Sequence, residues 1–247
     1  KSKMEKHLNI YGIRSIIEAI NKKINIDKVW LLKSQKSTLF NHLFSLININ
    51  KIPYSFIPKE GFEKFSKKNF QGAVARISPI EIFDFEKKLE EIIENTKIPL
   101  IILLDGITDT RNFGAIIRTA AATKTNTIVV STNNSAPIND DVIKTSAGGV
   151  FKIPISKVDN LKDAIYILKS NNIEVIALTE KANDLIYNYK LSKPLSIILG
   201  SEDKGISKGI LKIVDKKAKI PMKNIGDSLN VSVACGVTLF EIMRQRQ

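Results

Sequence analysis

Polar side chains gather between an apolar run and a helical pattern in the stretch "LLDGITDTRNFGAIIRTAAA" (103–122). Asn112 and Arg118 stand on either side of the small residues Gly114 and Ala115. Helical side chains lean toward the N-terminus, so we expect the guanidinium of Arg118 to reach back toward the loop. A guanidinium there could bind phosphate or stabilise an oxyanion.

For isolated residues, a solvated arginine and a capping asparagine are the simpler interpretation, and Asn112 is the natural N-cap of this helix. Only 6 of the 38 Lys and Arg residues are arginine, however. Two of them, Arg111 and Arg118, belong to this one corner, a concentration that an excess of lysine does not supply.

A second loop, "ILGSEDKGIS" (198–207), places Glu202 between Gly200 and Gly205. Glycine lets the backbone turn sharply and approach a ligand closely, although an ordinary turn has the same composition. The lysine does not follow the second glycine, so the loop is not a phosphate-binding P-loop. It is not a dinucleotide fingerprint either, because it lacks the G-x-G-x-x-G spacing.

A third segment, "IPMKNIGDSLNVSVACGVTLFEIMRQR" (220–246), leads through Ser228 and Asn230 into a helix rich in small residues. Asn230 could be a plain N-cap, and Ser228 could serve a turn. Cys235 is predicted to be a small core residue, since no histidine accompanies it as a catalytic partner.

The elements that must hold these loops alternate between strand and helix. Several of the apolar runs lack a clean alternation, which is typical of parallel strands buried on both faces. In open parallel sheets, ligands bind beyond the carboxyl ends of the strands, where the three loops are expected. The predicted strands are 99–105, 126–131, 149–155, 173–179, 195–200 and 218–222, and the predicted helices are 113–123, 140–147, 158–171 and 231–246.

The first 80 residues form a separate pattern, typical of a small α/β sandwich. It consists of a helix over 10–24, a strand at 28–32, a helix over 37–48, and strands at 52–57 and 72–77. The sequence therefore predicts a first domain over 1–80, an acidic linker over 81–97 and a second domain over 98–247.

The charge distribution favours a polyanionic partner. The net charge is +13, and residues 1–80 carry 15 basic against 5 acidic residues, a net +10. Basic surfaces bind nucleic acid by releasing counterions, which favours RNA or DNA over a mere bias toward lysine.

Other function classes lack their expected patterns. Two distant histidines and one cysteine indicate neither a metal site nor a disulfide framework, and the single cysteine suits the cytoplasm. No apolar run is long enough for a membrane span, and we expect no secretory signal.

Together, "RNFGAIIRTA", "LGSEDKG" and "IPM…SLNVSVA" resemble the three ordered motifs of the SpoU (TrmH-type) branch of the SPOUT methyltransferases. Residues 10–78, with "YGIRSIIEAI" and "FQGAVA", are similar to the L30e-like RNA-binding domain of the 23S rRNA guanosine 2′-O-methyltransferases. The resemblance covers about nine-tenths of the chain. It implies methyl transfer from S-adenosylmethionine to a ribose 2′-hydroxyl of RNA.

The resemblance also implies roles for individual residues. Arg118 and Asn112 match the first motif, Glu202 the second, and Ser228 and Asn230 the third, as the catalytic set. A guanidinium is a very poor base, so phosphate binding and alkoxide stabilisation are the roles we expect of Arg118. The implied cofactor positions are Thr179, Gly200, Ile220, Met222 and Leu229, and we expect Arg14 and Arg111 to contact RNA.

The family further implies a C-terminal trefoil knot in the α/β domain and a homodimer. This chain departs from the usual motifs at Thr110 and Arg111, and at Asn69 and Phe70 before "QGAVA". Two alternatives to an rRNA enzyme stay open, a tRNA 2′-O-methyltransferase and a catalytically silent RNA-binding relative.

Overall fold

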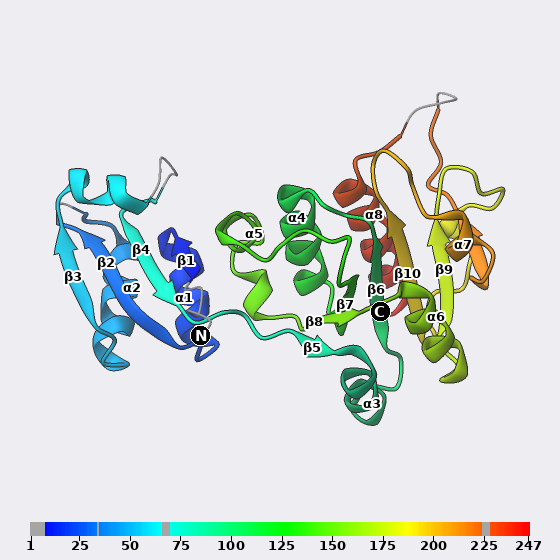
Figure 1. Ribbon diagram of the computed structural model, residues 1–247, viewed down its shortest axis with the longest axis horizontal. Coiled ribbons are helices and arrows are strands. Elements are labelled where there is room, and N and C mark those ends of the chain that lie inside the picture. The colour runs from blue at the N-terminus through cyan, green and yellow to red at the C-terminus, as the bar shows by residue number, and fades with distance from the viewer. Residues whose placement is uncertain (1–7, 34, 66–69, 224–227) are drawn as a thin grey trace. The chain divides into compact units, whose positions relative to one another are not determined.

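The computed structural model describes residues 8–33, 35–65, 70–223 and 228–247 (Figure 1). The chain divides into two compact units, which are treated separately below. The first unit holds the chain up to residue 81 together with 138–152, and the second holds 82–137 and 153–247. In the described part of the chain, no helix could span a membrane.

The first unit is built on a four-stranded sheet in the order β1-β4-β2-β3. β4 (Ala73–Ile77) runs antiparallel to both β1 (Leu8–Tyr11) and β2 (Ile26–Leu32), while β3 (Tyr54–Ile57) runs parallel to β2. The helices α1 (Ile13–Asn21) and α2 (Thr38–Ile49) pack against each other, and the 3-10 helix η1 (Lys59–Phe65) follows β3. The predicted α/β sandwich is confirmed.

One boundary in this unit was predicted wrongly. The helix expected from residue 10 begins at Ile13, and the preceding residues form β1. Gly12 has a φ of +91°, a conformation that ends the strand before the helix starts.

A segment from the middle of the sequence completes the first unit. α5 (Asp140–Thr145) packs on β1, where Asp140 Oδ1 accepts a hydrogen bond from the Asn9 amide at 3.1 Å. Lys152 forms an ion pair with Glu18 of α1 at 2.8 Å. A domain boundary read along the chain alone could not include this insertion.

The second unit contains a seven-stranded sheet in the order β11-β9-β10-β6-β7-β8-β5, with every pairing parallel. The parallel sheet predicted from the sequence is confirmed. The strands are β5 (Phe83–Asp84), β6 (Leu100–Asp105), β7 (Thr127–Ser131), β8 (Ile155–Val158), β9 (Glu174–Leu178), β10 (Leu195–Gly200) and β11 (Lys216–Ala218).

Two of these strands lie away from their predicted positions. The run expected as a strand from residue 149 starts as the 3-10 helix η2 (Gly149–Phe151), because the left-handed Gly148 turns the chain immediately before it. Its strand, β8, begins only after Pro154. The strand predicted at 218–222 ends at Ala218, so Ile220 and Met222 are free of the sheet.

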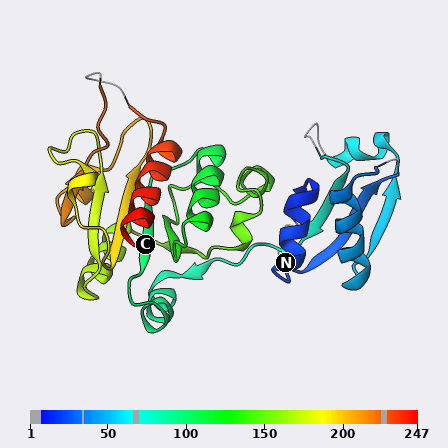
Figure 2. The same ribbon diagram turned by 180° about the vertical axis from the view of Figure 1, so that it is seen from behind.

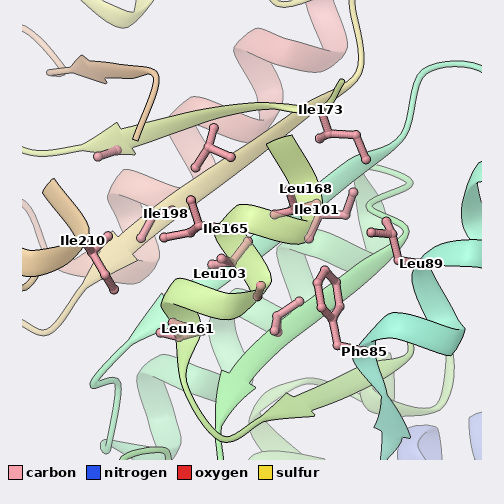
Figure 3. Packing of buried hydrophobic residues seen from close by; sticks show 14 of the residues in the cluster. Phe85, Leu89, Ile101, Leu103, Leu161, Ile165, Leu168, Ile173, Ile198 and Ile210 are labelled. Atoms are coloured by element: carbon pink, nitrogen blue, oxygen red, sulfur yellow. The ribbon is translucent and has the colours of Figure 1, made fainter. Parts of the chain in front are cut away.

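Helices cover both faces of this sheet. α3 (Phe85–Asn95) and α6 (Leu161–Ser170) bury one face in a cluster that includes Ile101, Leu103 and Ile198 of the strands (Figure 3). On the other face, α4 (Thr110–Ala122) and α8 (Val231–Gln245) lie side by side (Figure 2). The short elements η3 (Ile186–Asn188) and α7 (Lys208–Leu211) complete the unit.

The acidic stretch expected to be a linker forms β5 and α3. Phe85 and Leu89 of α3 are buried in the core of the second unit. The acidic side chains of α3 lie on its solvent-exposed face. The high local charge therefore marks one face of an amphipathic helix and not a linker.

The carboxyl-terminal end of α8 is fixed to the sheet by one arginine. The guanidinium of Arg246 donates to the carbonyl oxygens of Ile98 at 2.8 Å and Lys193 at 2.7 Å. These carbonyls precede β6 and β10, the two central strands. Fixing this end of α8 sets the position of its other end, where Asn230 lies.

Candidate active site

The first two polar loops leave the sheet side by side. β6 and β10 are paired in register, so their last residues, Asp105 and Gly200, are direct partners. The Asp105 carboxylate accepts a hydrogen bond from the backbone amide of Ser207 at 2.7 Å. This bond ties the far end of the second loop to the start of the first.

A cluster of two amides and a carboxylate joins all three loops. Asn112 donates from Nδ2 to Glu202 Oε1 at 2.9 Å. Asn230 donates from Nδ2 to the same carboxylate oxygen and to Asn112 Oδ1, the latter at 3.0 Å. Residues 90 and 118 positions apart thus meet in one hydrogen-bonded cluster.

The helix cap of the first loop differs from the sequence prediction. The N-cap of α4 is Asp109, whose side chain accepts hydrogen bonds from the amides of Arg111 and Asn112. Asn112 therefore lies in the first turn of the helix, and the assignment of Asn112 as the cap was wrong. Because Asp109 caps the helix, the side-chain amide of Asn112 is free to bond with Glu202 and Asn230.

Asn230 combines capping with membership of the cluster. Its Oδ1 accepts from the Ser232 amide at 2.9 Å and from the Ser232 hydroxyl at 2.6 Å, which caps α8. Its Nδ2 is left to donate to Asn112 and Glu202. The same side chain therefore caps α8 and joins the hydrogen-bonded cluster, while its catalytic role stays a prediction.

Gly200 is required by a close backbone approach. A Cβ at this position would lie 2.1 Å from the Gly205 carbonyl carbon and 2.2 Å from the Ile206 nitrogen. The loop closes on itself through the Gly205 amide, which donates to the Ser201 carbonyl at 2.8 Å. Gly205 has a φ of +65°, so both glycines meet a backbone requirement.

A cavity of about 450 Å³ opens between these segments. Its walls come from residues 178–181, from the loop 199–206, and from Ile220, Met222, residues 228–231 and Ala234. Glu202, Ser228 and Asn230 line it, so the cavity reaches the hydrogen-bonded cluster. Its size is in the range of cavities that hold small molecules and cofactors.

Comparison with known proteins assigns the chain to a family. Residues 99–240 match the model of the SpoU rRNA Methylase family. The chain belongs to the SpoU family. Residues 9–83 match a second model, described as RNA 2′-O ribose methyltransferase substrate binding.

Named relatives of this SpoU protein cover its whole length. It is 33% identical over 247 residues to the 23S rRNA (guanosine-2′-O-)-methyltransferase RlmB of Pseudomonas putida, covering 100% of this chain and 98% of the relative. It is 32% identical to a putative TrmH family tRNA/rRNA methyltransferase of Staphylococcus saprophyticus, covering 96% of this chain and 95% of the relative.

A solved structure shares the SpoU fold. It is the SpoU methyltransferase AviRb from Streptomyces viridochromogenes in complex with AdoMet, with a TM-score of 0.82. The two chains are 20% identical, and the match covers 97% of this chain and 90% of that one.

The chemistry of the cavity fits S-adenosylmethionine. Leu178, Leu199 and Ile206 provide apolar wall for a flat base, and backbone groups of the loop lie beside them. The charged residues Glu180, Lys181, Asp203 and Lys204 are also in the lining. They offer partners to the amino, carboxylate and sulfonium groups of such a molecule. The five positions expected to contact the cofactor, Thr179, Gly200, Ile220, Met222 and Leu229, all line the cavity.

The three arginines predicted to act at the site or on RNA lie outside the hydrogen-bonded cluster. Arg118 is exposed on α4, six residues after Asn112, and does not line the cavity. It has no hydrogen bond or ion pair with any residue that the structure describes. Arg111 is exposed in the first turn of the same helix, and Arg14 is exposed on α1 of the first unit.

Cys235 is inert, as its predicted place in the core requires. It is 1% exposed, and burial raises the pKa of its thiol to about 12. Among the described residues, no group of three or more His, Cys, Asp and Glu side chains could hold a metal ion.

Sequence reasoning missed several residues of the site. Asp105 was not singled out, and Asp109 was not predicted to be the cap, although an aspartate before a helix is a common cap signal. The charged residues at 180–181 follow a predicted strand, so their position at a carboxyl end could have been noticed.

Proposed function

We propose that this SpoU protein transfers a methyl group from S-adenosylmethionine to the 2′-hydroxyl of a guanosine in 23S ribosomal RNA. The RlmB relatives bear this activity in their names and match the chain over nearly its full length. The reaction breaks the bond between sulfur and methyl, forms a bond from methyl to the ribose oxygen and releases the hydroxyl proton.

The observation that carries the proposal is the hydrogen-bonded cluster, of which Glu202 and Asn230 line the cavity. Asn112, Glu202 and Asn230 come from three separate loops, and each forms a side-chain hydrogen bond with both of the others. A fold that needed only stability could cap α8 without engaging Glu202. Such pre-organised polar groups beside a cofactor-sized cavity are typical of catalytic sites.

In this proposal, bound S-adenosylmethionine supplies an electrophilic methyl group on a sulfonium. Asn112, Glu202, Ser228 and Asn230 hold the ribose in line for attack, which is how positioning accelerates such a transfer. Arg118 binds the neighbouring RNA phosphate and stabilises the alkoxide that develops at the 2′-oxygen. Its exposed guanidinium, which has no partner among the described residues, is consistent with this role.

The loops at the carboxyl ends of β9 and β10 hold the cofactor in this scheme. Thr179, Gly200, Ile220, Met222 and Leu229 contact it, largely through backbone groups. In the first domain, residues 1–80, the net charge of +10 docks the RNA, with Arg14 among the contacts. Arg111, on α4 of the second unit, is a further proposed RNA contact. The trefoil knot of the family and a cytoplasmic site of action belong to the same proposal.

Methylation mapping tests the function directly. We expect the purified protein to incorporate methyl groups into an unmodified 23S rRNA transcript, at one guanosine found by mass spectrometry of nuclease digests. An unmodified tRNA pool is the matched substrate control. Methylation of tRNA alone would overturn the rRNA assignment while leaving the reaction type intact.

Two comparisons name tRNA. One is the putative TrmH family tRNA/rRNA methyltransferase of Staphylococcus saprophyticus, which matches 96% of this chain. The other is the TrmH/SpoU tRNA modifying enzyme of A. aeolicus, which is 32% identical but covers only 65% of this chain, with a TM-score of 0.55. The RlmB relatives, which are named for 23S rRNA and match this chain over both units, favour the rRNA substrate.

Replacing Asn230 with serine is expected to separate its two roles. Serine keeps the cap of α8, so the free energy of unfolding should change by less than about 0.5 kcal/mol. It cannot donate to both Glu202 and Asn112, so we expect kcat to fall at least about tenfold. Thermal melts and single-turnover methylation measure the two effects, and an unchanged kcat would remove Asn230 from the proposed machinery.

A homodimer formed through α8 is also part of the proposal. Val233 and Phe240 lie seven residues apart on one helical face, and they are 50% and 51% exposed. Apolar side chains of this size on one stripe are typical of an interface.

We expect light scattering to give twice the chain mass, and Phe240→Asp to give the mass of one chain. Tyr166→Asp on α6 is the matched control, because Tyr166 is 56% exposed on the opposite face of the sheet. A monomeric parent protein would refute the dimer without touching the reaction.

A further inference from the structure

One face of the sheet in the first unit is divided into an apolar half and a basic half. Tyr11, Val74 and Trp30 are register partners across β1, β4 and β2 and share a core cluster with Phe62 of η1. Side chains two residues apart lie on the same face of a strand. The next row on this face is therefore Asn9, Arg76 and Lys28, which are also register partners.

Two cations of that row lie over a single indole ring. Arg76 Cζ is 5.3 Å and Lys28 Nζ is 5.8 Å from the centroid of the Trp30 ring. Trp30 is itself held by Phe65, with ring centroids 4.5 Å apart. The contact with a fixed ring orients the Arg76 guanidinium, while both cations remain partly exposed.

The fold does not neutralise this pair. Like charges directly opposite each other on neighbouring strands are destabilising. Neither Arg76 nor Lys28 makes a hydrogen bond or an ion pair with any residue in the described ranges. A sheet face that only had to be soluble would be expected to alternate charges or to pair them.

We propose that Arg76 and Lys28 form a backbone-binding site for the RNA substrate, in which the two cations engage phosphate groups. The guanidinium suits a phosphate because its donors form a planar fork, and the ammonium adds a second charge beside it. The inference deepens the proposed function, on which it rests. It places RNA contacts on the sheet face that carries Trp30, in addition to those expected at Arg14.

Salt-dependent binding of polyuridylate to the full chain tests this site. For a single strand, each phosphate contact contributes about 0.7 to the slope of log K against log salt. We expect Arg76→Gln and Lys28→Gln each to reduce the slope by about 0.7 and to weaken binding about fivefold at 0.1 M salt. Arg76→Lys keeps the charge and should preserve the slope.

Lys87→Gln is the matched control, since Lys87 is an exposed lysine on α3 of the second unit and lies outside the charge proposed to dock RNA. It should leave the slope unchanged. Lys28→Gln should melt no lower than the parent protein, because it removes one of two facing like charges. Slopes equal to the parent's in both glutamine variants would overturn the site.

Methylation of a 23S rRNA transcript separates this inference from the proposed function. If the parent protein methylates the transcript and the variants raise KM at an unchanged kcat, the site is supported. Parent methylation with the same KM in both variants would reject the site alone. A parent protein that binds polyuridylate through these residues but methylates no RNA would reject the proposed function alone.

Discussion

Replacing Arg118 with alanine is expected to lower kcat for RNA methylation about a hundredfold or more. In the proposed reaction, the guanidinium offsets the charge that develops on the 2′-oxygen, and loss of one such donor typically costs 10²–10³ in rate. Arg118 does not line the cavity, so the Kd for S-adenosylmethionine should stay the same. Single-turnover methylation and calorimetric titration measure these two quantities.

Stability should be nearly unaffected by this substitution. Arg118 is exposed and has no described partner, and such surface changes usually alter the free energy of unfolding by less than about 0.5 kcal/mol. Arg118→Lys keeps the charge but not the planar fork, and we expect an intermediate rate. Arg118→Ala with the parent's kcat would exclude the residue from the chemistry.

The parallel sheet was predictable because its strands are buried on both faces and read as apolar runs. Leu100–Asp105 and Leu195–Gly200 agree with the predicted strands to within one residue at either end. Rules on strand polarity then placed all three polar loops at one edge. The cavity there is lined by Glu202 and Asn230, as that argument requires.

What the sequence could not supply were choices between equivalent residues and contacts across long separations. Asp109 and Asn112 are both good N-caps, and only the positions of Glu202 and Asn230 decide which one is free for the cluster. The insertion of α5 into the first unit depends on Asp140 meeting the Asn9 amide, 131 residues away. Periodicity carries no information about such a pairing.

The pairing of Lys28 with Arg76 was hidden for the same reason. The two residues stand 48 positions apart, and each alone is an ordinary basic residue on a strand. Their register and the shared Trp30 ring make them a pair. The net charge of the first 80 residues predicted a basic surface, but not where on the fold it would be concentrated.

Replacing Gly200 with alanine should weaken cofactor binding more than any other single methyl group added to this loop. The new Cβ would lie 2.1 Å from the Gly205 carbonyl carbon and 2.4 Å from its oxygen, whereas carbon atoms in contact prefer about 3.5–4.0 Å. Backbone cannot rotate aside as a side chain does, so the whole 201–206 loop must move. That loop lines the cavity and carries Glu202.

We therefore expect Gly200→Ala to raise the Kd for S-adenosylmethionine at least about tenfold and to cost about 1–3 kcal/mol of stability, the usual range for overpacking. Gly205→Ala is the informative contrast. Its Cβ would meet no atom within 4 Å, so only the strain of a φ of +65° opposes it.

Gly236→Ala is the neutral control, because its nearest contact would be Thr119 Cγ2 at an ordinary 3.9 Å. In the middle of α8, alanine should raise stability by up to about 1 kcal/mol. Calorimetry should thus give the highest cofactor affinity for Gly236→Ala, a lower one for Gly205→Ala and the lowest for Gly200→Ala. A Gly200→Ala protein that binds the cofactor as tightly as the parent would show that the loop closure at Gly200 does not shape the cofactor site.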